Sequence, residues 1–239
     1  MTTPSRLILM PGIDGTGISF EPLAELLPPE VAVTVVRYPP DRILSFEETL
    51  RCAEAQMPEE PHALVIAESF SGLVVTALLG SGRLRAARGL VLCAAFARSP
   101  QPVFFSLLDR LPLAGMLRLP FPRRLMSHVV HGGAASVDVF FAIWRRIQTM
   151  VEPEVLIERL RLINRVDVRP YLPRLTLPCA YLQATGDRTV PTSAVVDFST
   201  SIPQLQVYRI PGPHFILQAQ PLACWAAISD FMIRHSLPS

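Results

Sequence analysis

The sequence has 239 residues, of which 50% are hydrophobic, so it is long enough for one large domain or for a core with one insertion. Its net charge of +2 is too small to indicate a nucleic-acid-binding protein. No stretch of about 18 apolar residues runs without a charge, which argues against a transmembrane helix, and the first residues reach a Pro-Gly loop too early for a signal peptide, so we expect a cytoplasmic protein.

Composition also bears on cofactors. All 22 basic residues are arginines, so no lysine is present to form a Schiff base or to complete a GxxxxGK phosphate-binding loop. The four cysteines form no CxxC pair and have no metal-ligand spacing. We therefore expect free, buried thiols and neither a metal nor a cofactor.

Short apolar runs alternate with helical patterns along most of the chain. The runs predict six strands, at residues 6–12, 31–39, 63–69, 89–97, 179–187 and 205–213. Continuous apolar runs are typical of strands covered on both faces, which indicates a parallel sheet with crossover helices. The fold class predicted is therefore α/β, with a doubly wound, mostly parallel sheet of about six strands.

Local signals also mark several helices of this core. Ser45 and Glu48 form a capping-box pattern that opens a helix to about Met57. A second helix should follow Ser69 and stop near Gly80, and residues 219–235 should form the last one.

The alternation is interrupted at residues 102–172, where the pattern is helical and punctuated by prolines. We expect three or four short helices in this inserted segment. The core would then comprise residues 1–101 and 173–239.

The strongest local motif is Ala67-Glu68-Ser69-Phe70-Ser71-Gly72, between a predicted strand and a predicted helix. A nucleophile on such a sharp turn needs small residues two positions before and after it, and Ala67 and Ser71 meet that need. Gly72 would let the helix pack closely on the sheet. The alternative is that Ser69 is an ordinary helix N-cap.

Two further residues follow in the order that a Ser-acid-His triad requires. Asp187 lies beyond the fifth predicted strand, although Asp is also common in turns, and Asp109 is the nearest competing acid. His214 follows the sixth strand in a Pro-Gly-Pro-His loop, which can aim an imidazole over the edge of the sheet. The other histidines fit worse, since His62 precedes a strand.

A glycine-rich loop, PGIDGTG, follows the first strand but matches neither GxGxxG nor GxxxxGK. In a serine hydrolase, the backbone N–H groups of Ile13 and Phe70 would form the oxyanion hole. We expect the Asp14 side chain to turn outward and brace the Gly15–Gly17 turn.

The set PGIDGTG, AESFSG, GDRTVP and GPHF resembles the α/β-hydrolase superfamily, and in particular its capped serine esterases and lipases. The resemblance implies that Ser69, Asp187 and His214 cleave carboxylic esters or thioesters of apolar acyl groups through an acyl-enzyme. It departs from the family pattern at Pro11-Gly12, where the family usually has His-Gly. An acyltransferase and a non-catalytic ligand receptor on the same fold stay open.

In that family, an insertion at this place is a cap over the substrate pocket. By this resemblance Phe105, Phe141 and Trp144 would be substrate-binding residues. The segment is also basic, with ten arginines against six acids between 103 and 170. Three of these arginines, Arg159, Arg161 and Arg165, fall on one predicted helix. They could dock an acidic acyl carrier protein or a phosphate-bearing thioester, although an ordinary solvated surface explains them as well.

Overall fold

The computed structural model of the chain describes residues 6–58, 63–103, 106, 133–235 and 237. The predictions made for Phe105 and Asp109 therefore lie outside the described residues.

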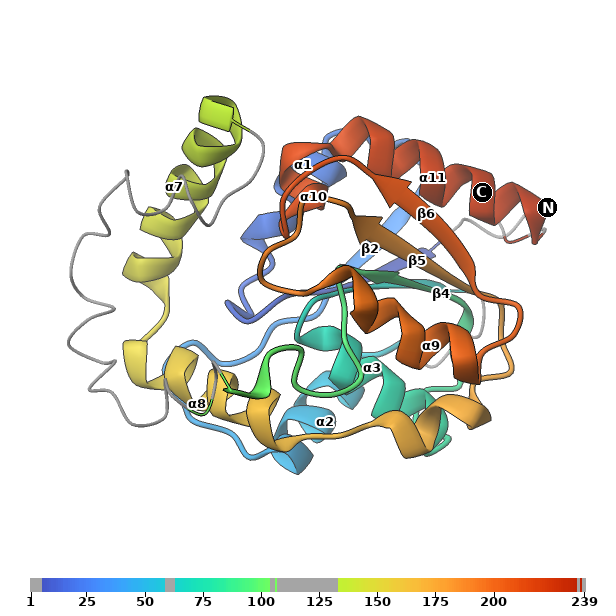
Figure 1. Cartoon of the computed structure of the whole chain (residues 1–239), viewed down its shortest axis with the longest axis horizontal. Coiled ribbons are helices and arrows are strands. Elements are labelled where there is room, and N and C mark those ends of the chain that lie inside the picture. The colour runs from blue at the N-terminus through green and yellow to red at the C-terminus, as the bar shows by residue number, and fades with distance from the viewer. Residues whose placement is uncertain (1–5, 59–62, 104–105, 107–132, 236, 238–239) are drawn as a thin grey trace.

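A single six-stranded sheet forms the centre of the molecule (Figure 1). The spatial order is β2-β1-β3-β4-β5-β6, and every neighbouring pair is parallel. The strands are β1 (Arg6–Met10), β2 (Ala32–Val35), β3 (Ala63–Glu68), β4 (Ala87–Cys93), β5 (Cys179–Ala184) and β6 (Gln206–Ile210). This confirms the predicted doubly wound parallel sheet.

Several predicted strands extend past the point where the observed ones end. The fourth apolar run continues to residue 97, but β4 stops at Cys93 because Ala94 has a left-handed backbone with φ of 46°. Hydrophobicity continues beyond the strand because the loop that follows is itself buried.

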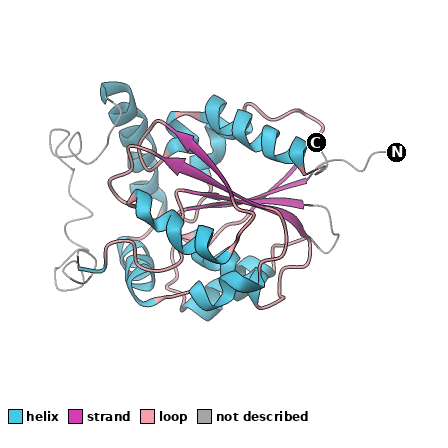
Figure 2. Ribbon diagram, turned by 45° about the vertical axis from the view of Figure 1, so that its right-hand side comes forward, coloured by secondary structure: helices cyan, strands magenta, loops and turns pink. Residues whose placement is uncertain are grey.

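Helices cover both faces of the sheet (Figure 2). They are α1 (Glu21–Ala24), α2 (Phe46–Glu54), α3 (Ser71–Gly80), α7 (Gly133–Met150), α8 (Pro153–Arg165), α9 (Val195–Ser201), α10 (Ile216–Ala219) and α11 (Pro221–Arg234). Short 3-10 turns are η1 (Ile18–Phe20), η2 (Arg169–Arg174) and η3 (Thr192–Ala194). None of the helices in these described ranges is long and apolar enough to cross a membrane.

The alternation of side chains along each strand creates two hydrophobic cores. On β1, Ile8 and Met10 join the core beneath α2 and α3, whereas Leu7 and Leu9 join the core beneath α1 and α11. The predicted capping box of α2 is confirmed: Ser45 Oγ accepts from the Glu48 N–H at 3.3 Å, and Glu48 accepts from the Ser45 N–H at 2.8 Å.

Helix α3 lies unusually close to the sheet at its first turn. A Cβ atom built on Gly72 would lie 2.6 Å from the Cβ of Ala95, just beyond β4. Only glycine fits at this position without a shift of the backbone, as the sequence predicted. The nucleophile motif is therefore held tightly against the strand ends.

In the inserted segment, α7 has 18 residues and α8 has 13, so both are longer than the short helices predicted. Both lie on the same side of the molecule in Figure 1, away from α11. Leu162 and Ile163 of α8 belong to the core beneath α2 and α3, whereas α7 packs through Ile147 against Ile18. The division of the chain into a core and a cap stays a prediction.

Candidate functional site

Ser69 occupies the turn between β3 and α3 and has φ of 50°, a left-handed conformation rare outside glycine. Its N–H donates to the Cys93 carbonyl at 2.9 Å, and its carbonyl accepts from the Gly72 N–H at 2.9 Å. These bonds hold the strained turn in place, and an ordinary N-cap residue would have an extended backbone instead.

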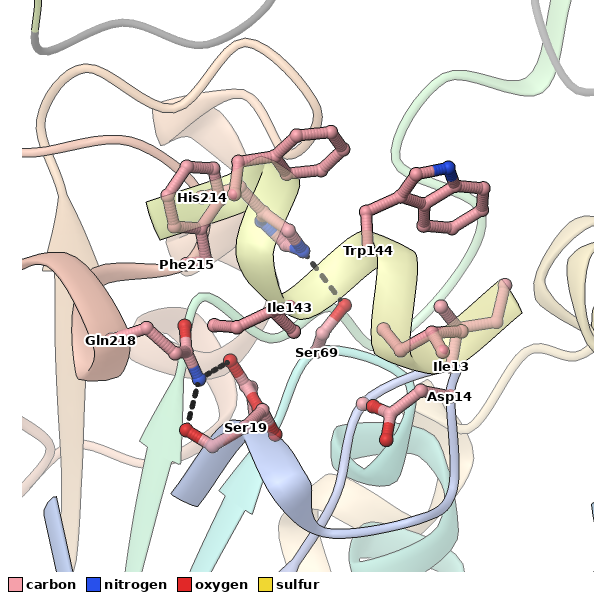
Figure 3. A pocket seen from close by; sticks show the side chains of 13 residues that line it. Ile13, Asp14, Ser19, Ser69, Ile143, Trp144, His214, Phe215 and Gln218 are labelled. Carbon is pink, nitrogen blue, oxygen red and sulfur yellow. Dashed lines mark hydrogen bonds between the residues drawn. The ribbon is translucent and has the colours of Figure 1, made fainter. Parts of the chain in front are cut away.

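Ser69, His214 and Asp187 form one continuous hydrogen-bonded chain. Ser69 Oγ lies 2.9 Å from His214 Nε2 (Figure 3). His214 Nδ1 lies 2.7 Å from Asp187 Oδ2. The other oxygen of Asp187 accepts from the N–H groups of Thr189 and Val190, both at 2.8 Å. The three side chains predicted from separate loops therefore meet in the order and orientation that base-assisted nucleophilic attack requires.

Two carboxylates act on the pKa of His214. Burial of the ring lowers this pKa, but the charge and hydrogen bond of Asp187 and the charge of Glu68 raise it by more. The net pKa lies above the ordinary value of about 6.5 for histidine. The imidazole is therefore a stronger base than a free histidine.

Glu68 is a feature of the site that the sequence did not reveal. It is 6% exposed, and its carboxylate accepts from Ser19 Oγ at 3.1 Å and from Gln218 Nε2 at 2.9 Å. Burial raises its pKa, with a further contribution from nearby Asp14. The one available signal was a glutamate at the end of an otherwise apolar buried strand.

The two backbone donors predicted for the oxyanion hole have no acceptor within the described structure. Neither the Ile13 N–H nor the Phe70 N–H donates a hydrogen bond to any of the residues placed there. The Gly12 carbonyl accepts from the Gly15 N–H at 3.2 Å. Because the peptide bond is planar and trans, the Ile13 N–H must point the opposite way, out of this turn.

Asp14 braces the loop as predicted, since Asp14 Oδ2 accepts from the Thr16 N–H at 2.8 Å and from the Thr16 hydroxyl. The prediction that its side chain turns outward is wrong. Asp14 is only 4% exposed, because the loop folds under the inserted segment instead of opening to solvent.

A cavity of about 160 Å³ opens beside Ser69 and His214. One wall of the cavity, formed by residues of α7, is apolar, and its floor, which contains Glu68 and Asp14, is polar. The described lining is formed by Gly12, Ile13, Asp14, Ser19, Glu68, Ser69, Phe140, Ile143, Trp144, Ile147, His214, Phe215 and Gln218. Figure 3 shows Trp144, Ile143 and Ile13 arranged around the Ser69 hydroxyl.

Of the aromatic residues predicted to bind substrate, Trp144 lines the cavity. Phe141 instead packs against Val137 and is not among the described lining residues. The sequence missed that Phe140 takes the lining position next to it. The phase of an α-helix cannot be fixed from an aromatic pair alone, because adjacent residues differ by about 100° around the axis.

The predicted basic surface is smaller than the sequence suggested. Arg159 is 6% exposed, so its assignment to a docking surface is wrong: its guanidinium points inward to backbone carbonyls. The side chains of Arg161 and Arg165 are 39% and 62% exposed, and both contact Glu158. A single carboxylate on the same helix therefore compensates part of the charge of these two arginines.

Metal ligands are not gathered anywhere in the described ranges, which contain no group of three or more His, Cys, Asp or Glu able to hold an ion. The cysteines are free as predicted; three are buried and Cys52 is half-buried.

The sequence matches no protein-family model and no curated protein. The structure, however, is similar to solved structures along almost its whole length. An enol-lactonase from Burkholderia xenovorans LB400 has a TM-score of 0.77 at 15% identity, covering 97% of this chain and 92% of its own. A bromoperoxidase from Bacillus anthracis has a TM-score of 0.78 at 15% identity, covering 96% and 92%. A thermophilic esterase from Thermogutta terrifontis has a TM-score of 0.71 at 20% identity, covering 98% and 91%.

Proposed function

We propose that this chain, which has the α/β-hydrolase fold, is a serine hydrolase that cleaves carboxylic esters or thioesters of apolar acyl groups. The observation that carries the proposal is the hydrogen-bonded chain from Ser69 through His214 to Asp187, with Ser69 held in a left-handed turn. Two of the similar structures are named as an esterase and an enol-lactonase, which agrees with ester chemistry on this fold.

In the proposed mechanism, His214 Nε2 takes the proton of Ser69 Oγ as the oxygen attacks the substrate carbonyl carbon. The negative charge that develops on the carbonyl oxygen is stabilised by the backbone N–H groups of Ile13 and Phe70. His214 then gives the proton to the departing alcohol or thiol, and an acyl-Ser69 ester remains. A water molecule, deprotonated by His214, releases the acid in the second half of the cycle.

The cavity supports a neutral, largely apolar substrate. Its apolar wall comes mainly from α7, and its polar floor carries the carboxyl groups of Glu68 and Asp14. No arginine belongs to the part of the lining that is described. A substrate carboxylate would therefore meet like charge without a compensating cation.

An acyl carrier protein as partner remains a prediction that rests on the basic inserted segment without Arg159; Arg161 and Arg165 are its arginines on α8 that stay at least partly exposed. Acyl transfer uses the same acyl-enzyme, and it differs from hydrolysis in that product formation depends on an added alcohol. A non-catalytic receptor would form no acyl-enzyme.

The first test is Ser69→Ala, assayed with 4-nitrophenyl butanoate. We expect kcat to fall by about 10⁶-fold with an unchanged melting temperature, because the nucleophile is lost without disturbing the core. Wild-type protein should gain the mass of one organophosphonate after treatment with a fluorophosphonate, and the variant should not.

Ser199→Ala is the matched control, because Ser199 is an exposed serine on α9. It should keep full activity and full labelling. A Ser69→Ala enzyme with more than a tenth of wild-type activity would rule out this mechanism.

A further inference from the structure

A buried arginine reaches the loop that carries Ile13. Arg159 on α8 is 6% exposed, and its guanidinium donates to three backbone carbonyls: those of Ile13 at 2.8 Å, Asp14 at 2.7 Å and Pro39 at 2.8 Å. Burial lowers the pKa of Arg159, and the charge of Asp14 opposes this effect without a direct ion pair among the described residues. Backbone carbonyls, and not a bonded carboxylate, satisfy this buried guanidinium, which points to a role in holding the loop.

The carbonyls of this loop are held one after another. Those of Gly12 and Gly15 accept from the backbone N–H groups of Gly15 and Tyr38, at 3.2 and 2.9 Å. The two carbonyls between them, of Ile13 and Asp14, both accept from Arg159 Nη1. Backbone N–H groups therefore hold the two outer carbonyls of the loop, and Arg159 holds the two carbonyls between them.

These hydrogen bonds to the carbonyls of the loop also set the direction of the Ile13 N–H. The peptide plane before Ile13 is set by the Gly12 carbonyl, and the plane after it is set by Arg159. The Ile13 N–H lies in the first plane, and Arg159 holds the next two carbonyls of the turn that the Gly12–Gly15 hydrogen bond closes, so the turn keeps the N–H in one orientation. A preorganised donor of this kind stabilises an oxyanion without reorganising during the reaction.

The loop is also tied to the turn that carries Phe70. The Ser71 hydroxyl donates to the Pro11 carbonyl, so the Tyr38 hydroxyl must be the donor in its 2.7 Å contact with Ser71 Oγ. The Arg159 guanidinium lies 5.7 Å from the centre of the Tyr38 ring. One network thus joins α8, the loop of Ile13 and the turn of Phe70.

We propose that Arg159 is the positioning residue of the oxyanion hole: through its bonds to the Ile13 and Asp14 carbonyls, helix α8 fixes the Ile13 N–H relative to the Phe70 N–H. This inference rests on the proposed function. It gives the inserted segment a part in the chemical step as well as in the shape of the pocket. The role is specific to the transition state, because the substrate's own carbonyl carries little charge before attack.

The test compares Arg159→Met, which keeps the aliphatic stem of the side chain, with Arg145→Met, which removes an exposed arginine from the neighbouring helix α7. For Arg159→Met we expect kcat for 4-nitrophenyl butanoate to fall by about 10- to 100-fold with KM within about threefold of wild type, since losing one oxyanion donor entirely costs about 10²–10³ in kcat. Arg145→Met should match wild type.

A second readout separates positioning from general stability. Phenylboronic acid adds to a serine hydroxyl to give a tetrahedral anion, and its inhibition constant should rise in Arg159→Met by about the same factor as kcat falls. Arg159→Lys keeps the cation but has no fork to span two carbonyls, so it should show the same pattern and carries the test if the Met variant does not fold.

Folded Arg159 variants with wild-type kcat, with only KM altered, or with unchanged boronic acid inhibition would overturn the proposal. Loss of folding in both variants would assign Arg159 to stability and would overturn it too. Activity surviving in Ser69→Ala would instead remove the proposed function itself, so the two failures are distinguishable.

Discussion

Two carboxylates raise the pKa of the His214 imidazole, and they do so by different interactions. Asp187 bonds the ring at Nδ1, whereas Glu68 acts through its charge alone. Burial raises the pKa of Glu68, and hydrogen bonds from Gln218 and Ser19 to its two carboxylate oxygens offset part of that increase. Glu68 therefore adjusts the strength of the base without taking part in proton transfer.

This arrangement predicts the pH dependence of the reaction. Only neutral His214 can accept the serine proton, so kcat/KM should rise with pH through the pKa of His214. Because that pKa is raised, the midpoint should lie above about 6.5. In Glu68→Gln one source of the increase is removed, and the midpoint should move to lower pH.

The measurement is kcat/KM against pH between 5 and 9 for wild type, Glu68→Gln and a control, Glu25→Gln, which removes an exposed carboxylate that is not among the causes of the raised His214 pKa. The control should follow wild type. A midpoint that stays in place in Glu68→Gln would mean that Glu68 is neutral in the active enzyme. Asp187→Asn should lower kcat by about 10⁴-fold, since the imidazole loses its orienting partner.

At the scale of elements, α7 builds the apolar wall of the cavity. Phe140, Ile143, Trp144 and Ile147 are spaced three and four residues apart, so they share one face of the helix. Trp144 stacks on Phe140 with the rings 6.1 Å apart and almost parallel. Its indole can therefore either contact the acyl chain or support the helix face that does.

Trp144→Ala distinguishes these roles through chain length. If the indole contacts the distal acyl chain, kcat/KM for 4-nitrophenyl octanoate should fall by roughly tenfold or more, and that for the acetate much less, because only the longer chain loses apolar contact. The matched control is Arg145→Ala, an exposed neighbour on the same helix. Equal losses on both esters would show that Trp144 supports α7 instead.

Charge is distributed unevenly over the whole molecule. The chain is basic overall, at +2, yet the described lining of its cavity contains carboxylates and no arginine. Arginines such as Arg98 and Arg234 lie at the surface, where they pair with acids. The described lining of the cavity therefore carries side chains of the sign opposite to the net charge of the protein.

A matched pair of esters tests this distribution. For 4-nitrophenyl hemisuccinate, kcat/KM should be about 10- to 100-fold lower than for the butanoate, since a like charge a few ångströms away in a partly buried site costs a few kcal/mol. Added salt should change the ratio little, because buried charges are poorly screened. In Glu68→Gln the difference in kcat/KM between the two esters should be smaller. Equal kcat/KM values for the two esters in wild type would contradict the assignment of negative charge to the cavity.

The sequence by itself determined the sheet, the nucleophile turn and the three residues that meet there. Apolar runs mark buried strands wherever they fall, and the carboxyl ends of parallel strands share one edge of the sheet. Ser69, Asp187 and His214 each follow such a run, so their meeting follows from local pattern and topology. Gly72 was predictable for the same reason, since close helix packing at this turn needs a glycine.

Only the tertiary structure decided which side chains reach these residues from elsewhere. On a helix pattern, Arg159 is indistinguishable from exposed Arg165, and only the packing of α8 turns it toward the Ile13 carbonyl. Glu68 likewise affects the pKa of His214 only because the fold brings the end of β3 close to the loop that carries His214. Local sequence specifies the conformation of an element, whereas the environment of a charge is set by whatever the packed chain brings within a few ångströms of it.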